Sequence, residues 1–327
     1  MRDVLSRLAL AACAAFVFAG VTAAQSSSQR SRESFNAGWR FQKDDPEGAS
    51  GRLAYEKIKG GVTRTGGEFV AGGAAPGPAR VDESLGADVA YTRREFDDSA
   101  WRRLDLPHDW GIEGPFKQEY PGETGKLPWW GVGWYRKHFD VPAADRGRQI
   151  YLDVDGAMSY ATVWLNGRFV GGWPYGYASF RLDLTPFVEY GTENVLAVRL
   201  DNPPDSSRWY PGGGIYRNVW LVKTAPVHVA HWGTYVTTPE VTPQSATVNV
   251  RVTLDNDSDA PADVTILTRL WELGPEGQVG ARPVAHSAVT RLSVAARGRT
   301  TRAADINVRR PRLWDTRRPS LYAALTT

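Results

Sequence analysis

The stretch from Asp201 to Val222, DNPPDSSRWYPGGGIYRNVWLV, decides how the chain folds. It lies between two expected strands, Glu193 to Leu200 before it and Asn218 to Val222 at its end. Pro211 fixes its own φ, and Gly212 to Gly214 allow positive φ and a close approach of backbone to backbone. The stretch therefore predicts a tight connection that holds its side chains in one orientation at a sheet edge.

Three side chains in this connection, Arg208, Trp209 and Tyr210, allow two interpretations. Arginine offers a planar fork of donors, and tryptophan or tyrosine offers an apolar face with a polar edge. That chemistry suits a sugar, which has apolar C–H faces and a rim of hydroxyls. The alternative is an inter-strand turn whose aromatic rings belong to the core, where large apolar side chains are usually found. The residues alone leave both interpretations open.

Short strands at regular spacing surround this stretch. Gly133 to Phe139 alternates, and Gln149 to Asp155 directs Ile150, Leu152 and Val154 to one face. Asn166-Gly167 is the strongest short signal for a hairpin. Ten of the 13 tryptophans lie between positions 101 and 232, which indicates a large core there. The pattern predicts an all-β chain whose first domain, residues 33–225, is a jelly-roll β-sandwich.

The composition changes near Lys223 to Val227. Beyond it, Thr247 to Leu254 alternates apolar and polar residues, and short strands with few aromatic residues continue to the end. This predicts an immunoglobulin-like β-sandwich over residues 226–327, truncated at its end. Residues 43–92 differ from both domains, because they contain ten glycines, no tryptophan and little periodicity. They predict a long surface insertion or a partly disordered segment.

Residues 1–24 have the pattern of a signal peptide. Two arginines precede the apolar run from Leu8 to Val21, and small residues at Thr22 to Ala24 suit cleavage. The apolar run is short for a membrane span, so no span is predicted and the chain is expected to be periplasmic or secreted. A second interpretation takes Leu10 to Cys13 as a lipoprotein cleavage box.

Charge and cysteine content exclude some functions. The chain has 39 Lys and Arg against 36 Asp and Glu, and the basic residues are scattered, so nucleic acid is not an expected partner. Cys13 is the only cysteine, so the mature chain would have no disulfide or cysteine metal site. His108 has no second ligand at metal-site spacing, and neither a metal nor a cofactor is predicted.

The polar pair His108-Asp109 next to Trp110 also has two interpretations. It forms either a buried network that holds its loop, or a site at which Asp109 accepts a hydrogen bond from substrate. Both remain open from the residues alone.

Seven blocks of the sequence follow one another in a recognisable order: LPHDW (Leu106 to Trp110), GWYRKHF (Gly133 to Phe139), VWLNGRFVG (Val163 to Gly171), GYASFRLDLTP (Gly176 to Pro186), NVLAVRLDN (Asn194 to Asn202), SRWYPGGGIYRNVWL (Ser207 to Leu221) and HWGTYVTTP (His231 to Pro239). In their order and spacing, these blocks resemble the N-terminal part of exported β-galactosidase-like members of glycoside hydrolase family 2.

The resemblance implies a sugar-binding jelly roll, an immunoglobulin-like domain and then a catalytic (β/α)₈ barrel. The family's barrel carries two glutamates, an acid/base that follows an asparagine and a nucleophile, and a retaining glycosidase needs such carboxyls about 5–5.5 Å apart. This chain has no Asn-Glu dipeptide and no alternating strand–helix pattern. We therefore expect a fragment without the catalytic pair, so no catalytic residue is assigned and the fragment alone should be inactive.

The function implied is the non-catalytic N-terminal portion of a retaining exo-β-galactosidase, which supports the substrate pocket of an absent barrel. Candidate residues of the pocket lip are Asp109, Arg208, Trp209 and Tyr210; some family members have an aspartate near the position of Arg208. The implied partners are a β-galactoside together with the missing barrel, and a homo-oligomer is possible in the full-length enzyme. Alternatives are a stand-alone carbohydrate-binding module, the front of a β-glucuronidase or β-mannosidase, or a structural interaction domain.

Overall fold

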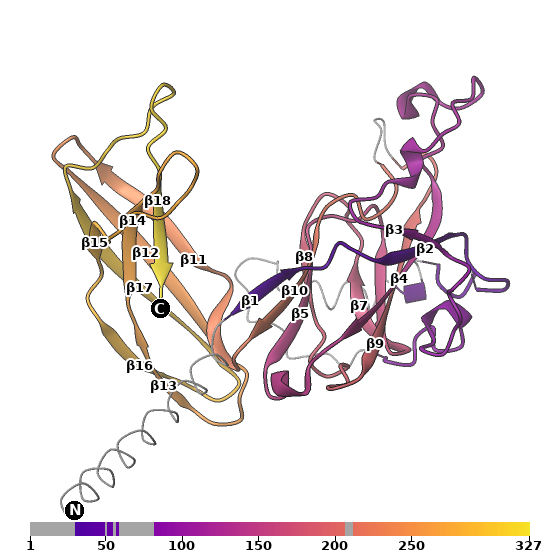
Figure 1. Cartoon of the computed structure of the whole chain (residues 1–327), viewed down its shortest axis with the longest axis horizontal. Helices are drawn as coiled ribbons and strands as arrows, with labels where there is room; N and C mark the ends of the chain where they lie inside the picture. Colours follow the sequence, from indigo (N-terminus) through magenta and orange to yellow (C-terminus); the bar gives the residue numbers. More distant parts are fainter. Residues whose placement is uncertain (1–29, 50, 55–56, 59–81, 207–211) are drawn as a thin grey trace, which may run out of the picture. The chain divides into compact units, whose positions relative to one another are not determined.

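The computed structural model describes residues 30–49, 51–54, 57, 58, 82–206 and 212–327. The chain divides into two units, Met1–Thr224 and Ala225–Thr327, and in both the described residues are organised as β-sheets (Figure 1). No described helix has the length and apolar character needed to cross a membrane. The predicted all-β fold class is therefore confirmed.

Two antiparallel sheets build the first unit. The six-stranded sheet has the order β3 (Arg102–Leu104), β2 (Trp39–Lys43), β4 (Gly131–Asp140), β9 (Glu193–Asn202), β6 (Ala161–Leu165), β7 (Arg168–Trp173). The four-stranded sheet has the order β1 (Ser31–Ser34), β10 (Val219–Thr224), β5 (Gln149–Val154), β8 (Phe180–Asp183). Short 3-10 turns lie in the connections, and they are η2 (Ala90–Thr92), η3 (Trp110–Ile112), η4 (Gly122–Thr124) and η5 (Ala143–Asp145).

The main core of this unit lies between the two sheets. Ile150 and Leu152 of β5 are fully buried there with Val163 of β6 and Leu196 of β9. Alternate residues of each strand face inward, as the period of two in the sequence predicts. The result is the predicted sandwich, and its strand ends position the connections that carry the candidate site.

A second core covers the outer face of the six-stranded sheet. Trp134 and Trp164 stack there at 5.4 Å between ring centroids, and Leu53, Ile58 and Val89 pack in the same cluster. Within the described parts of the segment 43–92, a few apolar side chains are thus buried on the sheet while most of the others are exposed or half-buried, and its assignment as an insertion stays a prediction. The physical reason is that the outer face of the sheet carries large aromatic rings, and covering them removes apolar area from water. Residues 59–81 lie outside the described residues.

One ion pair fixes the beginning of that segment to the sheet. Arg199 of β9 donates from Nε and Nη2 to the two carboxylate oxygens of Asp45, both at 2.7 Å, and Trp134 Nε1 donates to the same carboxylate at 2.9 Å. Both charged side chains are almost fully buried. A paired, hydrogen-bonded charge is the form in which burial is tolerated.

The second unit is also made of strands. One sheet has the order β11 (Val227–Val241), β12 (Ser245–Asn256), β17 (Gly298–Arg309); a ladder joins β13 (Ala262–Ile266) to β16 (Thr290–Val294); a third sheet has the order β15 (Ala285–His286), β14 (Thr268–Glu272), β18 (Tyr322–Thr326). Val248, Val250, Val252 and Leu254 of β12 are buried in one cluster. This is the face that the alternation of Thr247 to Leu254 predicts, and the sheets form the predicted sandwich.

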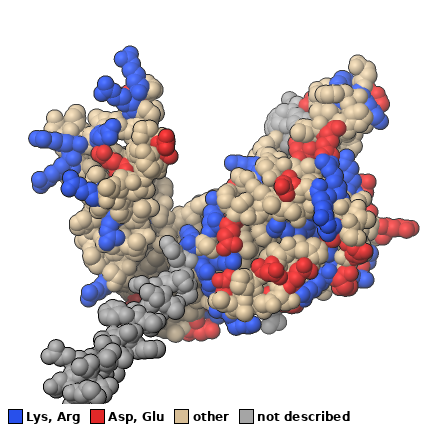
Figure 2. Space-filling view, viewed as in Figure 1, with Lys and Arg blue, Asp and Glu red and all other residues tan. Residues whose placement is uncertain are grey.

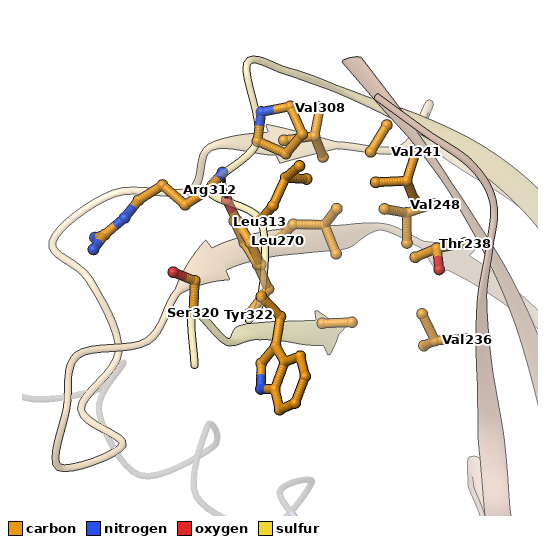
Figure 3. Close-up of a pocket in the computed structure, with 14 residues that line it drawn as sticks. Val236, Thr238, Val241, Val248, Leu270, Val308, Arg312, Leu313, Ser320 and Tyr322 are labelled. Carbon is orange, nitrogen blue, oxygen red and sulfur yellow. Dashed lines mark hydrogen bonds between the residues drawn. The ribbon is translucent and has the colours of Figure 1, made fainter. Parts of the chain in front are cut away.

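An apolar groove opens in the second unit (Figure 3). Its volume is about 360 Å³, and Val236 and Val241 of β11 line it together with Leu313 and Tyr322. Arg312 is drawn with its guanidinium directed away from the aliphatic side chains (Figure 3). A sugar site needs polar groups that converge on the ligand, so this groove is a poor candidate for one.

Candidate functional site

Connections of the first unit gather at one end of its sandwich. Gly131 at the start of β4 pairs with Asn202 at the end of β9, and Ala161 at the start of β6 pairs with Trp173 at the end of β7. The connections 111–130, 155–160, 174–179 and 203–218 therefore leave from this side, which we call the loop end. Arg208, Trp209 and Tyr210 fall between positions 203 and 218 in the sequence but lie outside the described residues, so their roles stay predictions.

Asp109 joins two connections of the loop end. Its Oδ1 accepts a hydrogen bond from the backbone N–H of Gly111 at 2.8 Å, which caps η3, and a second from the N–H of Gly213 at 2.9 Å. The side chain thus holds the glycine-rich connection against the Leu106 to Trp110 block. This geometry agrees with the loop-holding interpretation, and a contact between Asp109 and sugar stays a prediction.

His108 lies in a chain of hydrogen bonds. Its Nδ1 is 2.7 Å from the hydroxyl of Tyr135, and its Nε2 is 3.1 Å from Oε1 of Glu113. Burial lowers the pKa of His108, although the hydrogen bond to Glu113 opposes this. A neutral ring with its proton on Nε2 satisfies both contacts, because Tyr135 then donates to Nδ1 and His108 donates to Glu113.

The partners of His108 are held in matching states. Burial raises the pKa of Tyr135 well above its usual value, so its hydroxyl keeps the proton that it donates. Burial would raise the pKa of Glu113, but hydrogen bonds from Arg102 and His108 outweigh it and lower that pKa. Arg102 Nη1 donates to Glu113 at 2.6 Å. Both ring nitrogens of His108 are therefore hydrogen-bonded, and the side chain links β4, through Tyr135, to Glu113 in the connection that follows η3.

The glycine-rich connection is gripped through its main chain. Asn202 Nδ2 donates to the carbonyl oxygens of Trp129 and Gly212, both at 2.6 Å. A Cβ on Gly213 would lie 2.9 Å from the Trp110 ring, and one on Gly214, whose φ is +137°, would lie 2.3 Å from a backbone oxygen. The close backbone approach predicted for these glycines is confirmed. The role of Asn202 was missed, because an asparagine after a strand resembles any turn residue.

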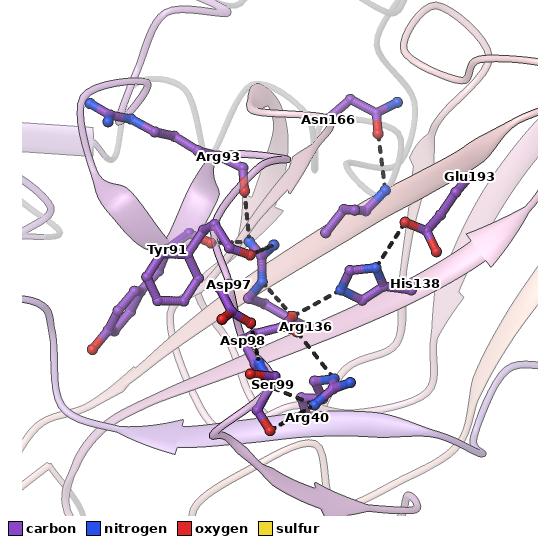
Figure 4. A network of polar contacts seen from close by, with 12 residues as sticks. Arg40, Tyr91, Arg93, Asp97, Asp98, Ser99, Arg136, His138, Asn166 and Glu193 are labelled. Carbon is purple, nitrogen blue, oxygen red and sulfur yellow. Dashed lines mark hydrogen bonds and ion pairs between the residues drawn. The ribbon is translucent and has the colours of Figure 1, made fainter.

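A polar network supports β4, the strand that begins at the loop end (Figure 4). Asp98 accepts from Arg136 Nε at 2.8 Å and lies 3.1 Å from Arg40 Nε and 3.0 Å from His138 Nε2. The fully buried Arg136 also donates to the carbonyl oxygens of Tyr91 and Arg93. Burial alone would raise the pKa of Asp98, but the hydrogen bonds from Arg136 and His138 outweigh it and hold that pKa below its usual range.

The surface of the first unit carries charges of both signs and some exposed aromatic rings. Lys and Arg alternate with Asp and Glu over the face seen in Figure 2. Within the described ranges, no group of three or more His, Cys, Asp or Glu side chains is placed to hold a metal ion. Exposed aromatic residues do occur at the loop end, and they include Phe116, Tyr175 and Tyr177.

The fold defines a class of protein, a chain of two β-sandwich domains. A family model described as "Glycosyl hydrolase 2 galactose-binding domain-like" matches residues 105–210, and one described as "Glycosyl hydrolases family 2" matches residues 227–327. The chain belongs to glycoside hydrolase family 2, and these matches are to domains at the N-terminal end of its members. The resemblance seen in the sequence is confirmed.

Named relatives and solved structures are similar to this chain over most of its length. A beta-galactosidase from Bacteroides ovatus is 45% identical over 74% of this chain and 28% of its own length. A beta-glucuronidase from Formosa agariphila is 26% identical over 92% of this chain and 28% of its own length. A crystal structure of a glycosyl hydrolase family 2 member from Bacteroides cellulosilyticus is 30% identical, with a TM-score of 0.71 over 90% of this chain and 33% of that one. The chain thus spans about a third or less of each of these proteins.

Proposed function

We propose that the chain is the non-catalytic N-terminal portion of a retaining exo-β-galactosidase, an enzyme that hydrolyses terminal β-galactosides. The observation that carries the proposal is the 45% identity to a protein named as a beta-galactosidase over 74% of this chain. The described residues form two sandwiches, and the barrel that supplies the two carboxyls in this family is not among them. Catalysis by this chain alone is therefore not expected.

The first unit would serve as one lip of the substrate pocket. Asp109 and Asn202 hold Gly213 and Gly212, and Arg208, Trp209 and Tyr210 come shortly before these glycines in the sequence. Ordering the backbone beside a ligand site in advance lowers the entropic cost of binding. The arginine fork and the aromatic rings suit the hydroxyls and the C–H face of a galactoside.

The front of a β-glucuronidase is the second candidate, because relatives from Formosa agariphila bear that name and match at 26% and 33% identity. A fold hosts several substrates, so the sugar must be settled by measurement. A stand-alone carbohydrate-binding module is a third candidate, and it differs in predicting micromolar rather than millimolar binding. We also propose export, because residues 1–24 have a signal-peptide pattern. N-terminal sequencing of the mature protein should then begin after Ala24.

Turnover of nitrophenyl β-D-galactopyranoside by the purified chain tests the proposal. We expect no hydrolysis, while the Bacteroides ovatus relative serves as positive control. Ligand-detected NMR with methyl β-D-galactopyranoside and methyl β-D-glucuronide tests the sugar. Millimolar binding of the galactoside alone is the expected result. Hydrolysis by the chain, or a clear preference for the glucuronide, would contradict the proposal.

A further inference from the structure

Three tyrosines form a continuous cluster at the loop end. The ring centroids of Tyr175 and Tyr177 are 5.8 Å apart with 62° between the planes, and those of Tyr177 and Tyr216 are 6.4 Å apart at 69°. Tyr175 is 59% exposed and Tyr177 is 42% exposed. We call these residues the tyrosine cluster. Tyr135 of the same unit is fully buried, so tyrosines of this unit are not exposed as a rule.

The connection that carries the cluster is held on several sides. The Tyr216 hydroxyl donates to the carbonyl oxygen of Gly176 at 2.9 Å, between the two exposed rings. A Cβ on Gly176 would lie 2.3 Å from Sδ of Met158, so the backbone is pressed against its neighbour. The N–H of Tyr160 donates to the Pro174 oxygen at 3.1 Å. Rings on a fixed backbone lose little entropy when a ligand binds.

The cluster offers groups that a sugar uses. An exposed tyrosine ring presents an apolar face beside a hydroxyl, and two rings at a steep angle form a corner that contacts a ligand from two directions. Tyr216 adds a hydroxyl whose pKa is raised by burial, so it stays protonated. The side chain of the exposed Arg217 lies close to the Tyr216 hydroxyl. Both contact the same point above Gly156, where an added Cβ would lie 2.8 Å from Arg217 Cδ and 2.9 Å from the Tyr216 hydroxyl oxygen.

The cluster is continuous with the candidate pocket lip along the chain. Tyr216 follows Gly214 by two residues, and Gly214 exchanges backbone hydrogen bonds with Met158 at 2.9 and 3.1 Å. The same Met158 supports Gly176. Met158 therefore connects the glycine-rich connection at Gly214 to the backbone that carries Tyr175 and Tyr177.

We propose that the tyrosine cluster is a second sugar subsite, at which Tyr175 stacks on a pyranose of a galacto-oligosaccharide and Tyr177 contacts its rim. The proposal rests on the galactoside preference proposed above, since a saccharide is the ligand assumed. It assigns the cluster to an additional sugar residue, not to the terminal one.

The test measures binding of β-1,4-galactotriose and of methyl β-D-galactopyranoside to the full chain by NMR titration. The trisaccharide should bind several-fold more tightly than the monosaccharide. Tyr175→Ala should weaken the trisaccharide about 5- to 10-fold, the range that loss of one aromatic contact gives, and leave the monosaccharide unchanged. Tyr235→Ala is the matched control, because Tyr235 is 54% exposed but lies on β11 of the second unit, outside the loop end, and it should change neither affinity. An unchanged thermal midpoint confirms that each variant is folded.

The outcomes separate the two proposals. Binding of galactotriose that is indifferent to Tyr175→Ala and Tyr177→Ala overturns the subsite and leaves the galactosidase assignment standing. Binding of a glucuronide trisaccharide that depends on Tyr175, with no galactoside binding, supports the subsite and overturns the galactoside preference. Absence of binding by every saccharide overturns the subsite and leaves the galactosidase assignment standing, because one lip of a pocket without its barrel is compatible with no measurable binding.

Discussion

Replacing Asp109 by alanine removes an acceptor that two backbone N–H groups share. Loss of the cap on η3 costs about 1 kcal/mol. Loss of the bond from Gly213 costs about 1.5 kcal/mol, the lower end for a charged acceptor, because the side chain is half-buried. The sum is about 2.5 kcal/mol of unfolding free energy. For a unit of this size that corresponds to a fall of roughly 5–10 °C in the thermal midpoint.

Two measurements check this expectation. Calorimetry gives the midpoint, and hydrogen exchange reports on the amide of Gly213, which should exchange about tenfold faster in the variant. Asp109→Asn keeps an acceptor oxygen and should lose about half as much stability. Asp315→Ala is the matched control in the second unit, where Asp315 accepts from the N–H groups of Arg317 and Arg318 at 2.7 and 2.9 Å. It should leave the exchange of Gly213 unchanged.

The result that refutes the reasoning is equally clear. If Asp109→Ala keeps the midpoint within 1 °C (roughly the shift expected for a few tenths of a kcal/mol) and keeps the exchange of Gly213, then the two hydrogen bonds carry no stability. A loss of sugar binding in such a stable variant would make Asp109 a ligand-contacting residue.

Two further changes test the backbone grip and the network around Asp98. Gly214→Ala should destabilise the first unit by more than about 2 kcal/mol, because the new Cβ would meet a carbonyl oxygen. Gly38→Ala should cost about 1 kcal/mol, because Gly38 also has a positive φ but has open space around it. Chemical denaturation measures both costs, and equal costs would contradict the clash at Gly214. Arg136→Met should cost about 3–5 kcal/mol and Arg40→Met much less, because only Arg136 is fully buried. In the unaltered chain, the lowered pKa of Asp98 makes its contribution to stability complete above the ordinary carboxyl pKa of 3.8, and this contribution is lost as pH falls below that value. Urea unfolding from pH 7 to pH 3 should therefore show a decline that is smaller in Asp98→Asn; part of the decline remains because Glu113 also has a lowered pKa.

The parts of the fold that the sequence predicted are those governed by a local period. Ile150 and Leu152 of β5, and Val248 and Val250 of β12, face the cores as their alternation indicated. The glycines of the connection after β9 were also predictable, because only a residue without Cβ tolerates their surroundings.

The features of the fold and the site that the sequence did not predict depend on contacts between residues distant in sequence. Leu53 and Ile58 are isolated apolar residues in a glycine-rich segment, and no period marks them as buried. Asp45 and Arg199 are 154 residues apart, so their ion pair has no local signature. His108 and Asp109 could be recognised as a polar pair, but their partners Tyr135 and Gly213 were set by tertiary packing.

Asp109 and Asn202 hold the glycine-rich connection through the backbone N–H of Gly213 and the carbonyl group of Gly212. Apart from Gly213 and Gly214, which have no room for a Cβ, positions of this connection can thus exchange one side chain for another without losing these hydrogen bonds. Substitutions that change ligand preference then cost little folding stability, because loops vary more freely in sequence than the scaffold that carries them. Such an arrangement allows ligand preference to change during evolution while the backbone of the connection is kept.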